Sequence, residues 1–303
     1  MDSSPNFLDP QALSELKDLR LRAAAIVDGL VSGMHRSPYQ GHSVEFSQHR
    51  EYVAGDEIRH VDWKVFARTD KIHLKQYEDE TNLCCTLLVD QSESMGFAGP
   101  DAPWNKFEFG SCLAVAFAWL VLNQRDAVSI GTFADTLVPP ARPTDQREAI
   151  DKIVNRLKSA TPRGSTRFAD CLNAFAVENS RRQVVVLISD CFDEFDSVAR
   201  GLEALRRRDH QVILLQVLDR SEIDFDFGEA LELSGMESEP TFRVDPIAVQ
   251  QAYRKVVEEK TAQLSTFCLN QQILFEQVCT QSNVGSVIRK LMQRNSGRRW
   301  MSK

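Results

Sequence analysis

The sequence predicts an α/β protein with a doubly wound, mostly parallel sheet of Rossmann type. Short apolar runs recur between residues 84 and 219, and each is apolar at nearly every position rather than at every second one. Strands buried on both faces of a parallel sheet have this pattern. Helical stretches separate the runs, so we expect helices on both faces of the sheet. The expected strands are 84–90, 127–133, 136–140, 183–190 and 211–219, and the expected helices are 106–124, 144–158, 166–178 and 195–208.

The first 82 residues have a different pattern. Leucines at helical spacing over residues 11–31 predict a helix within an N-terminal segment, 1–40. Residues 41–82 contain short pieces of β character, split by the turn signal Ala54-Gly55-Asp56. We therefore expect a small β-rich segment before the α/β domain, which we place at 83–222.

Residues 223–303 are expected to form an extension packed on the core, because no glycine- and serine-rich linker precedes them. ALELSG and TFRV are typical of a short hairpin, and a long helix is predicted over 247–268. Residues 273–279 are a candidate for one more strand of the sheet, and a last helix follows.

Composition narrows the class of protein. The chain has 303 residues and a net charge of −7, without a basic block, which argues against nucleic acid as a partner. The start of the chain does not resemble a signal peptide, and the longest apolar run, Cys112 to Leu122, is too short for a membrane span of about 20 residues. The seven cysteines are scattered without a CxxC motif, which is typical of reduced core thiols. Together these observations predict a cytoplasmic protein without a membrane span.

Polar side chains follow two of the predicted core strands. The run LLVDQSESM ends a strand with Asp90, Ser92 and Ser94, and Asp190 ends another. Thr166 lies at the start of a helix, just after Gly164. Ligands of open α/β sheets bind beyond the carboxyl ends of the strands, and oxygen atoms are the ligands that Mg²⁺ or Mn²⁺ prefers. These five residues are therefore candidate metal ligands, and the alternative is that their oxygens only cap turns and helix N-termini.

Several of these motifs resemble known families. The segments D-Q-S-E-S-M, G-S-T-R-F-A-D-C-L and L-I-S-D resemble the three loops of the metal-ion-dependent adhesion site of von Willebrand factor type A domains. Residues 55–80 are similar to the signature segment of the domain-of-unknown-function 58 family, in which a von Willebrand A-like domain follows. The resemblance implies that Asp90, Ser92 and Ser94 bind the cation directly or through water, Thr166 directly and Asp190 through water.

The chain departs from the adhesion-site pattern in two places. The third loop reads S-D-C-F-D where many such domains have T-D-G, so the turn after Asp190 is expected to differ. Glu93, between the two serines, either competes for the cation or faces solvent.

The resemblance implies a non-catalytic protein-interaction module that binds an acidic side chain of a partner through the cation. Members of the family are often encoded beside MoxR-type AAA+ ATPases, which implies an adaptor or co-chaperone acting with such an ATPase or its client. One rival is a metal-dependent hydrolase using the same site, with Cys191 and His210 as a minor candidate for a nucleophile and its base. The other rival is an extracellular adhesion domain, which the expected free thiols disfavour.

A second candidate surface lies in the β-rich segment. It is either an interaction patch or an ion-paired hairpin with its tryptophan packed on the sheet, and its residues are Asp56, Arg59, Asp62, Trp63 and Arg68. Five of the six histidines also fall in the first quarter of the chain, but their spacing fits no zinc motif.

Overall fold

The computed structural model describes residues 18–34, 49–51, 66, 73–75, 83–100, 102–225, 231–233, 242–244 and 246–295. Its centre is a six-stranded sheet in the order β10-β7-β6-β3-β4-β5. Every neighbouring pair is parallel except β4 and β5. This mostly parallel sheet confirms the predicted fold class. The strands are β3 (Cys84–Asp90), β4 (Ala127–Phe133), β5 (Leu137–Val138), β6 (Val184–Ser189), β7 (Gln211–Leu218) and β10 (Leu274–Cys279).

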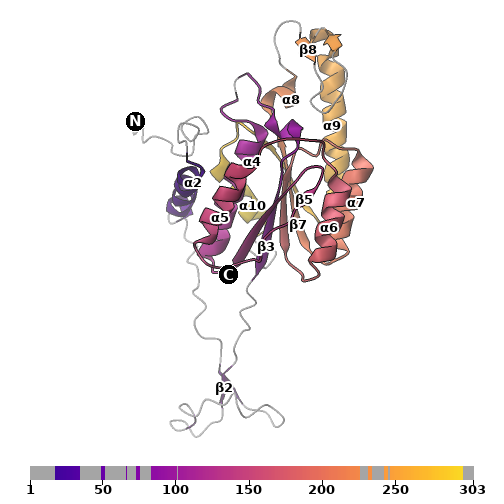
Figure 1. Cartoon of the computed structure of the whole chain (residues 1–303). Helices are drawn as coiled ribbons and strands as arrows, with labels where there is room; N and C mark the ends of the chain where they lie inside the picture. The colour runs from indigo at the N-terminus through magenta and orange to yellow at the C-terminus, as the bar shows by residue number, and fades with distance from the viewer. Residues whose placement is uncertain are drawn as a thin grey trace.

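Helices cover both faces of the sheet, and two apolar cores result (Figure 1). The pleat sends alternate residues of a strand to opposite faces, so Leu87 and Val89 enter the first core while Leu88 enters the second. The first core is covered by α2 (Leu19–Met34), α4 (Lys106–Asn123), α5 (Ala149–Ser159) and α10 (Val284–Asn295). The second is covered by α6 (Phe168–Glu178), α7 (Phe195–Arg206) and α9 (Pro246–Asn270).

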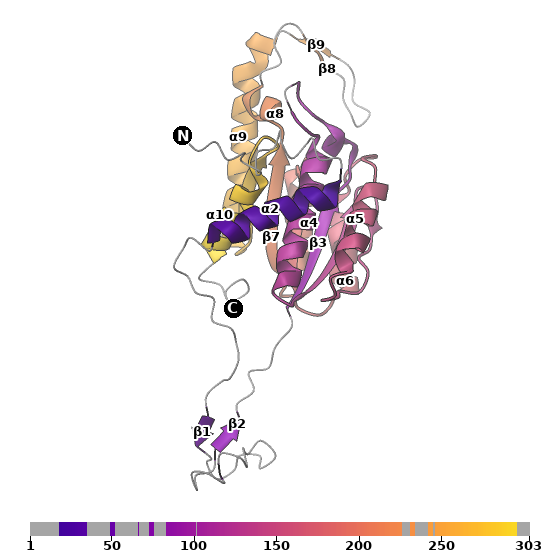
Figure 2. The ribbon, with the colours of Figure 1, turned by 90° about the vertical axis from the view of Figure 1, so that its left-hand side faces the viewer.

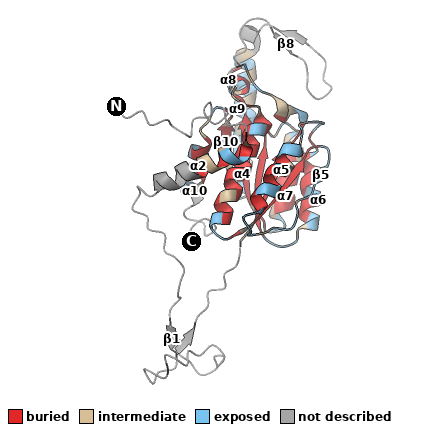
Figure 3. Cartoon of the chain, turned by 60° about the vertical axis from the view of Figure 1, so that its left-hand side comes forward, coloured by how far each residue is buried: buried red, intermediate tan, exposed pale blue. Residues whose placement is uncertain are grey.

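Helix α4 is buried on nearly all sides. A capping box starts it, in which the Asn105 side chain accepts from the backbone N–H of Glu108 and the Glu108 side chain accepts from that of Asn105. One side of α4 packs on the sheet, and α2 lies across the other, as Figure 2 shows. Figure 3 shows the burial that results in α4 and the central strands. An apolar helix between a sheet and a second helix needs no other explanation for its composition.

Three elements differ from the expectation. Helix α5 begins at Ala149 rather than 144, because Thr144 forms an isolated antiparallel bridge with Val128 and is therefore extended. The short helices η2 (Glu93–Gly96) and α8 (Arg220–Asp224) were not predicted. Strand β10, by contrast, was a predicted candidate, and it joins the sheet beside β7.

Two small antiparallel pairs lie outside the central sheet. Strand β1 (His49–Glu51) pairs with β2 (His73–Lys75), and β8 (Leu231–Leu233) pairs with β9 (Phe242–Val244), the hairpin expected from the sequence. Most of the predicted β-rich segment, 41–82, and the start of the predicted first helix fall outside the described residues.

Candidate metal centre at the crest of the sheet

The two aspartates of the site lie at the same edge of the sheet. Asp90 is the last residue of β3, and Asp190 directly follows β6, the parallel neighbour of β3. Both side chains are buried, with 0% and 1% exposure. We call this edge the crest, together with the loops that follow β3 and β6, the loop before α6, and the first turns of α4 and α8 that contact it.

The first crest loop turns tightly after Asp90. One carboxylate oxygen of Asp90, Oδ1, accepts the backbone N–H of Ser92 at 2.8 Å. The hydroxyls of Ser92 and Ser94 lie 3.1 Å apart, within hydrogen-bond distance of each other. Glu93 is exposed, so of the two alternatives for this residue its carboxylate faces solvent.

The second crest loop is joined to the first by backbone hydrogen bonds. The N–H of Glu93 donates to the carbonyl of Gly164 at 2.9 Å, and the N–H of Arg163 donates to that of Gln91 at 2.8 Å. Gly164 has a φ of +72°, a conformation that favours glycine. The turn places Thr166 just before α6, and its hydroxyl is buried without a hydrogen-bond partner among the described residues.

The third crest loop keeps a left-handed turn without glycine. Cys191 has a φ of +57°, the region in which glycine is the usual residue. Oδ1 of Asp190 accepts the N–H of Phe192 at 3.0 Å, which closes the turn. The S-D-C-F-D sequence therefore forms a turn of the kind that a glycine would favour, with a cysteine in its place.

Lys106, the first residue of α4, is a member of the crest that the sequence did not predict. Its ammonium is fully buried and donates to Oδ2 of Asp190 at 2.8 Å and to Oε1 of Glu222 at 2.7 Å. The Phe192 ring lies 4.9 Å from the ammonium and adds a cation–π contact. Glu222 is itself held by the capping box of α8, since it accepts the N–H of Asp219 at 2.7 Å. The available signal was a lysine in the first turn of an otherwise apolar helix.

Asp90 has no such cationic partner among the residues that the structure describes. Its Oδ2 accepts the hydroxyl of Ser189 at 2.6 Å, so its donors are neutral groups. Burial, and after it the charge of Asp190, raises the pKa of Asp90 to about 7. Burial alone would lower the pKa of Lys106, but the charges of Asp190 and Glu222 outweigh it and raise that pKa. The crest thus holds three carboxyl groups and one ammonium, which leaves negative charge in excess.

These donors fit a hard divalent cation. Asp90 supplies a carboxylate without a cationic partner, and the hydroxyls of Ser92, Ser94 and Thr166 supply neutral oxygens. Asp190 fits less simply, because Lys106 already binds one of its oxygens. Within the described residues no group of three or more histidine, cysteine, aspartate or glutamate side chains could hold a metal, so this site depends on its hydroxyls.

The candidate nucleophile and base of the hydrolase alternative lie at opposite ends of the sheet. Cys191 follows the carboxyl end of β6, while His210 precedes the amino end of the neighbouring strand β7. The six residues of β6 separate them, or roughly 20 Å at about 3.3 Å per residue. Burial and the charges of Asp190 and Asp90 raise the pKa of the Cys191 thiol well above its usual range. The prediction that Cys191 and His210 form a nucleophile–base pair is therefore wrong.

The second candidate surface cannot be placed. Asp56, Arg59, Asp62, Trp63 and Arg68 all fall outside the described residues. Their assignment as an interaction patch stays a prediction.

The chain is similar to a family of known sequences and to several solved structures. The sequence model of the family described as "Protein of unknown function DUF58" matches residues 48–265. An uncharacterized protein of Mycobacterium tuberculosis is 28% identical over 245 residues, which cover 78% of this chain and 75% of the relative. The von Willebrand A domain of SpRpn10 has a TM-score of 0.40 at 11% identity, over 69% of this chain and 95% of that domain. An aerotolerance-related membrane protein from Bacteroides fragilis has a TM-score of 0.42 at 13% identity, over 70% of this chain and 97% of that one.

The prediction of a cytoplasmic protein is contradicted by this last comparison, since the Bacteroides fragilis protein is a membrane protein. The sequence pattern could not predict this, because a buried sheet and its covering helices have the same pattern whether or not such a domain is attached to a membrane. Among the described residues, α4 is the one helix long and apolar enough to cross a membrane, and 83% of it is buried inside the fold. Its composition is that of a core helix.

Proposed function

The chain belongs to the DUF58 family, and we propose that it is a non-catalytic protein-interaction module that binds an acidic side chain of a partner at the crest. Its von Willebrand A-like fold is typical of interaction modules. The finer proposal is that Mg²⁺ or Mn²⁺ mediates the contact. When bound, the cation would supply a positive charge for an incoming carboxylate.

One observation carries this proposal: within the described part of the chain, the carboxyl group of Asp90 is fully buried without a cationic partner, and the buried Thr166 hydroxyl in the same set of loops has no hydrogen-bond partner. A buried charge is costly unless it is paired or binds a metal. In this proposal Asp90, Ser92, Ser94 and Thr166 hold the cation. Asp190, bound by Lys106, contributes through water with the oxygen that does not contact the ammonium.

The partner we propose is a MoxR-type AAA+ ATPase or the client that it remodels, with this chain as an adaptor or co-chaperone. The support is the family membership and the resemblance of the crest loops to an adhesion site. The hydrolase alternative has less support, since its candidate nucleophile and base lie at opposite ends of the sheet.

The test is metal binding followed by partner capture. We expect Asp90→Ala to abolish Mn²⁺ and Mg²⁺ binding in calorimetry, and to abolish capture of the purified MoxR-type ATPase from the same genome. Chelator should abolish capture by the wild-type chain as well. Unchanged metal affinity in Asp90→Ala would refute the site, and capture that persists in chelator would remove the metal from the mechanism.

A matched pair of substitutions tests the neutral ligands. Thr166→Val removes a buried hydroxyl of the crest, and Ser111→Ala removes another buried hydroxyl without a partner in the described structure, on α4. We expect Thr166→Val to weaken Mn²⁺ binding about tenfold, or about 1.4 kcal/mol, and Ser111→Ala to leave it unchanged. Equal affinities in the two variants would exclude Thr166 as a ligand.

A further inference from the structure

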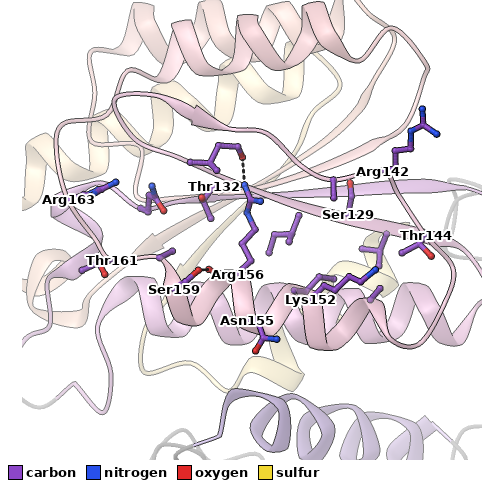
Figure 4. A pocket seen from close by; sticks show the side chains of 18 residues that line it. Ser129, Thr132, Arg142, Thr144, Lys152, Asn155, Arg156, Ser159, Thr161 and Arg163 are labelled. Atoms are coloured by element: carbon purple, nitrogen blue, oxygen red, sulfur yellow. Dashed lines mark hydrogen bonds between the residues drawn. The ribbon is translucent and has the colours of Figure 1, made fainter.

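A cavity lies beside the crest, between the β4–β5 edge of the sheet and α5 (Figure 4). Its volume is about 700 Å³, within the range of pockets that hold small molecules. Strand β4 lines one wall, α5 lines the opposite wall, and the segments before and after α5 close the ends.

Among the described residues that line this cavity, the charged ones are all basic. They are Arg142, Lys152, Arg156 and Arg163, and no described aspartate or glutamate lines it. The lining thus carries an excess of positive charge, although the chain as a whole has a net charge of −7. The nearby acidic residues do not line the cavity, and Asp151 of α5 is paired with Arg20 instead. A cleft lined by charges of one sign concentrates the potential of that sign inside it.

The guanidinium of Arg156 is held in place by two hydrogen bonds. Its Nη2 donates to the backbone carbonyls of Val138 at 2.8 Å and of Pro139 at 3.0 Å. Carbonyl oxygens orient the guanidinium without neutralising it, and burial lowers its pKa. Lys152 and Arg163 are exposed, and neither makes an ion pair within the described part of the chain.

Apolar side chains, among them Val128, Ile130 and Ile153, and neutral hydrogen-bonding groups complete the lining. The hydroxyls of Thr132 and Thr161 lie among the basic side chains, whereas the Ser159 hydroxyl donates to the carbonyl of Arg156 at 2.8 Å (Figure 4). A fixed guanidinium, free basic side chains and hydroxyls together form the donor set that binds phosphate and carboxylate groups.

We propose that this cavity binds a small polyanion, a metabolite that carries phosphate or carboxylate groups. The concave shape and the volume favour a small molecule over an acidic protein segment, which would need an extended surface. The cavity is also joined to the crest, because Gln91 lines it and accepts the N–H of Arg163 at 2.8 Å. The ligand therefore lies directly behind the first crest loop.

The experiment is calorimetry on the full chain in metal-free, low-salt buffer, with pyrophosphate, ATP and citrate as probes and adenosine as the neutral control. The absence of divalent cations prevents the probes from reaching the crest through a bound metal. We expect binding of at least one anionic probe and none of adenosine. The phosphate probes and citrate distinguish the two kinds of anion.

Matched variants locate the site. The double variant Lys152→Gln/Arg163→Gln should weaken binding of the anionic probe at least tenfold, because it removes two charges from exposed positions that the fold does not need. Arg147→Gln, an exposed arginine of the same region outside the cavity, should leave the affinity unchanged. Asp90→Ala should also retain it, so that failure of the metal site and failure of this proposal can be told apart.

Three results would overturn the proposal. The first is no binding of any anionic probe at millimolar concentration. The second is an equal loss of affinity in Arg147→Gln and in the double variant. The third is binding of an oligo-aspartate peptide without binding of any of the small probes, which would make this surface a protein-docking site instead.

Discussion

Two loops of the crest bring an aspartate to the same edge of the sheet, yet the two carboxyl groups have opposite surroundings. Asp190 shares the buried ammonium of Lys106 with Glu222, at 2.8 and 2.7 Å. Asp90, on the neighbouring strand, accepts from a serine hydroxyl and a backbone N–H. Position at a strand end therefore does not decide which aspartate is available to a cation. The difference is made by one lysine at the start of α4.

The largest effect is expected from removing that lysine. Lys106→Met keeps most of the side-chain volume but leaves the carboxylates of Asp190 and Glu222 buried without a cation. Breaking a buried ion pair in this way costs about 3–5 kcal/mol. We expect the free energy of unfolding, measured by urea denaturation at neutral pH, to fall by that amount.

Lys158→Met is the matched control. Its ammonium pairs with Asp18 at 3.5 Å, but both side chains are about half exposed, so we expect a loss below about 1 kcal/mol. If Lys106→Met were as stable as Lys158→Met, the contact with Lys106 would not be what makes the surroundings of Asp190 differ from those of Asp90.

A somewhat smaller effect on the free energy of unfolding is expected from replacing Asp90. At neutral pH this substitution should stabilise the fold, whereas Lys106→Met should destabilise it. The pKa of Asp90 is raised to about 7, chiefly by burial, so the folded chain keeps a proton that the unfolded chain loses near pH 4. Stability then falls as pH rises from about 4 to 7, by up to about 4 kcal/mol for a shift of about three units. Asp90→Asn lacks this charge.

We therefore expect Asp90→Asn and the wild-type chain to be about equally stable near pH 4, and the variant to be more stable near pH 7. The measurement is urea denaturation across this range in metal-free buffer. Added Mn²⁺ should stabilise the wild-type chain at pH 7 and leave the variant unchanged. If the free energies of unfolding of the two chains changed in parallel with pH, Asp90 would not be the buried group whose charge destabilises the fold.

Much of the fold could be predicted because local pattern decides it. The residues of β3 and β4 are apolar at nearly every position, and both strands have the predicted bounds. The positions of Asp90 and Asp190 followed for the same reason, since parallel strands present their carboxyl ends at one edge. Thr144 was predicted as helix and is extended, because a bridge to Val128 is a tertiary contact that no local pattern records.

The electrostatics of the site could not be predicted in the same way. Lys106 and Glu222 are distant in sequence from Asp190, and their contact depends on how α4 and α8 pack at the crest. The basic cavity has the same origin, because Lys152 and Arg156 of α5 meet Arg142, which precedes that helix, and Arg163, which follows it. Charge patterns of this kind arise from packing and become visible only in the folded chain.

The smallest effect is expected at Cys191, in the loop that positions Asp190. Cys191→Gly relieves a left-handed conformation that costs an ordinary residue about 1–2 kcal/mol, but glycine adds about 0.5–1 kcal/mol of backbone entropy to the unfolded chain. The lost side chain also leaves the second core, on which it packs. These terms nearly cancel, so we expect a change within about 1 kcal/mol in the free energy of unfolding. Cys191→Val should lose more, since a β-branched residue is a poor fit to positive φ. A valine variant as stable as the wild type would mean that this loop adopts another turn, and that Asp190 is held by Lys106 alone.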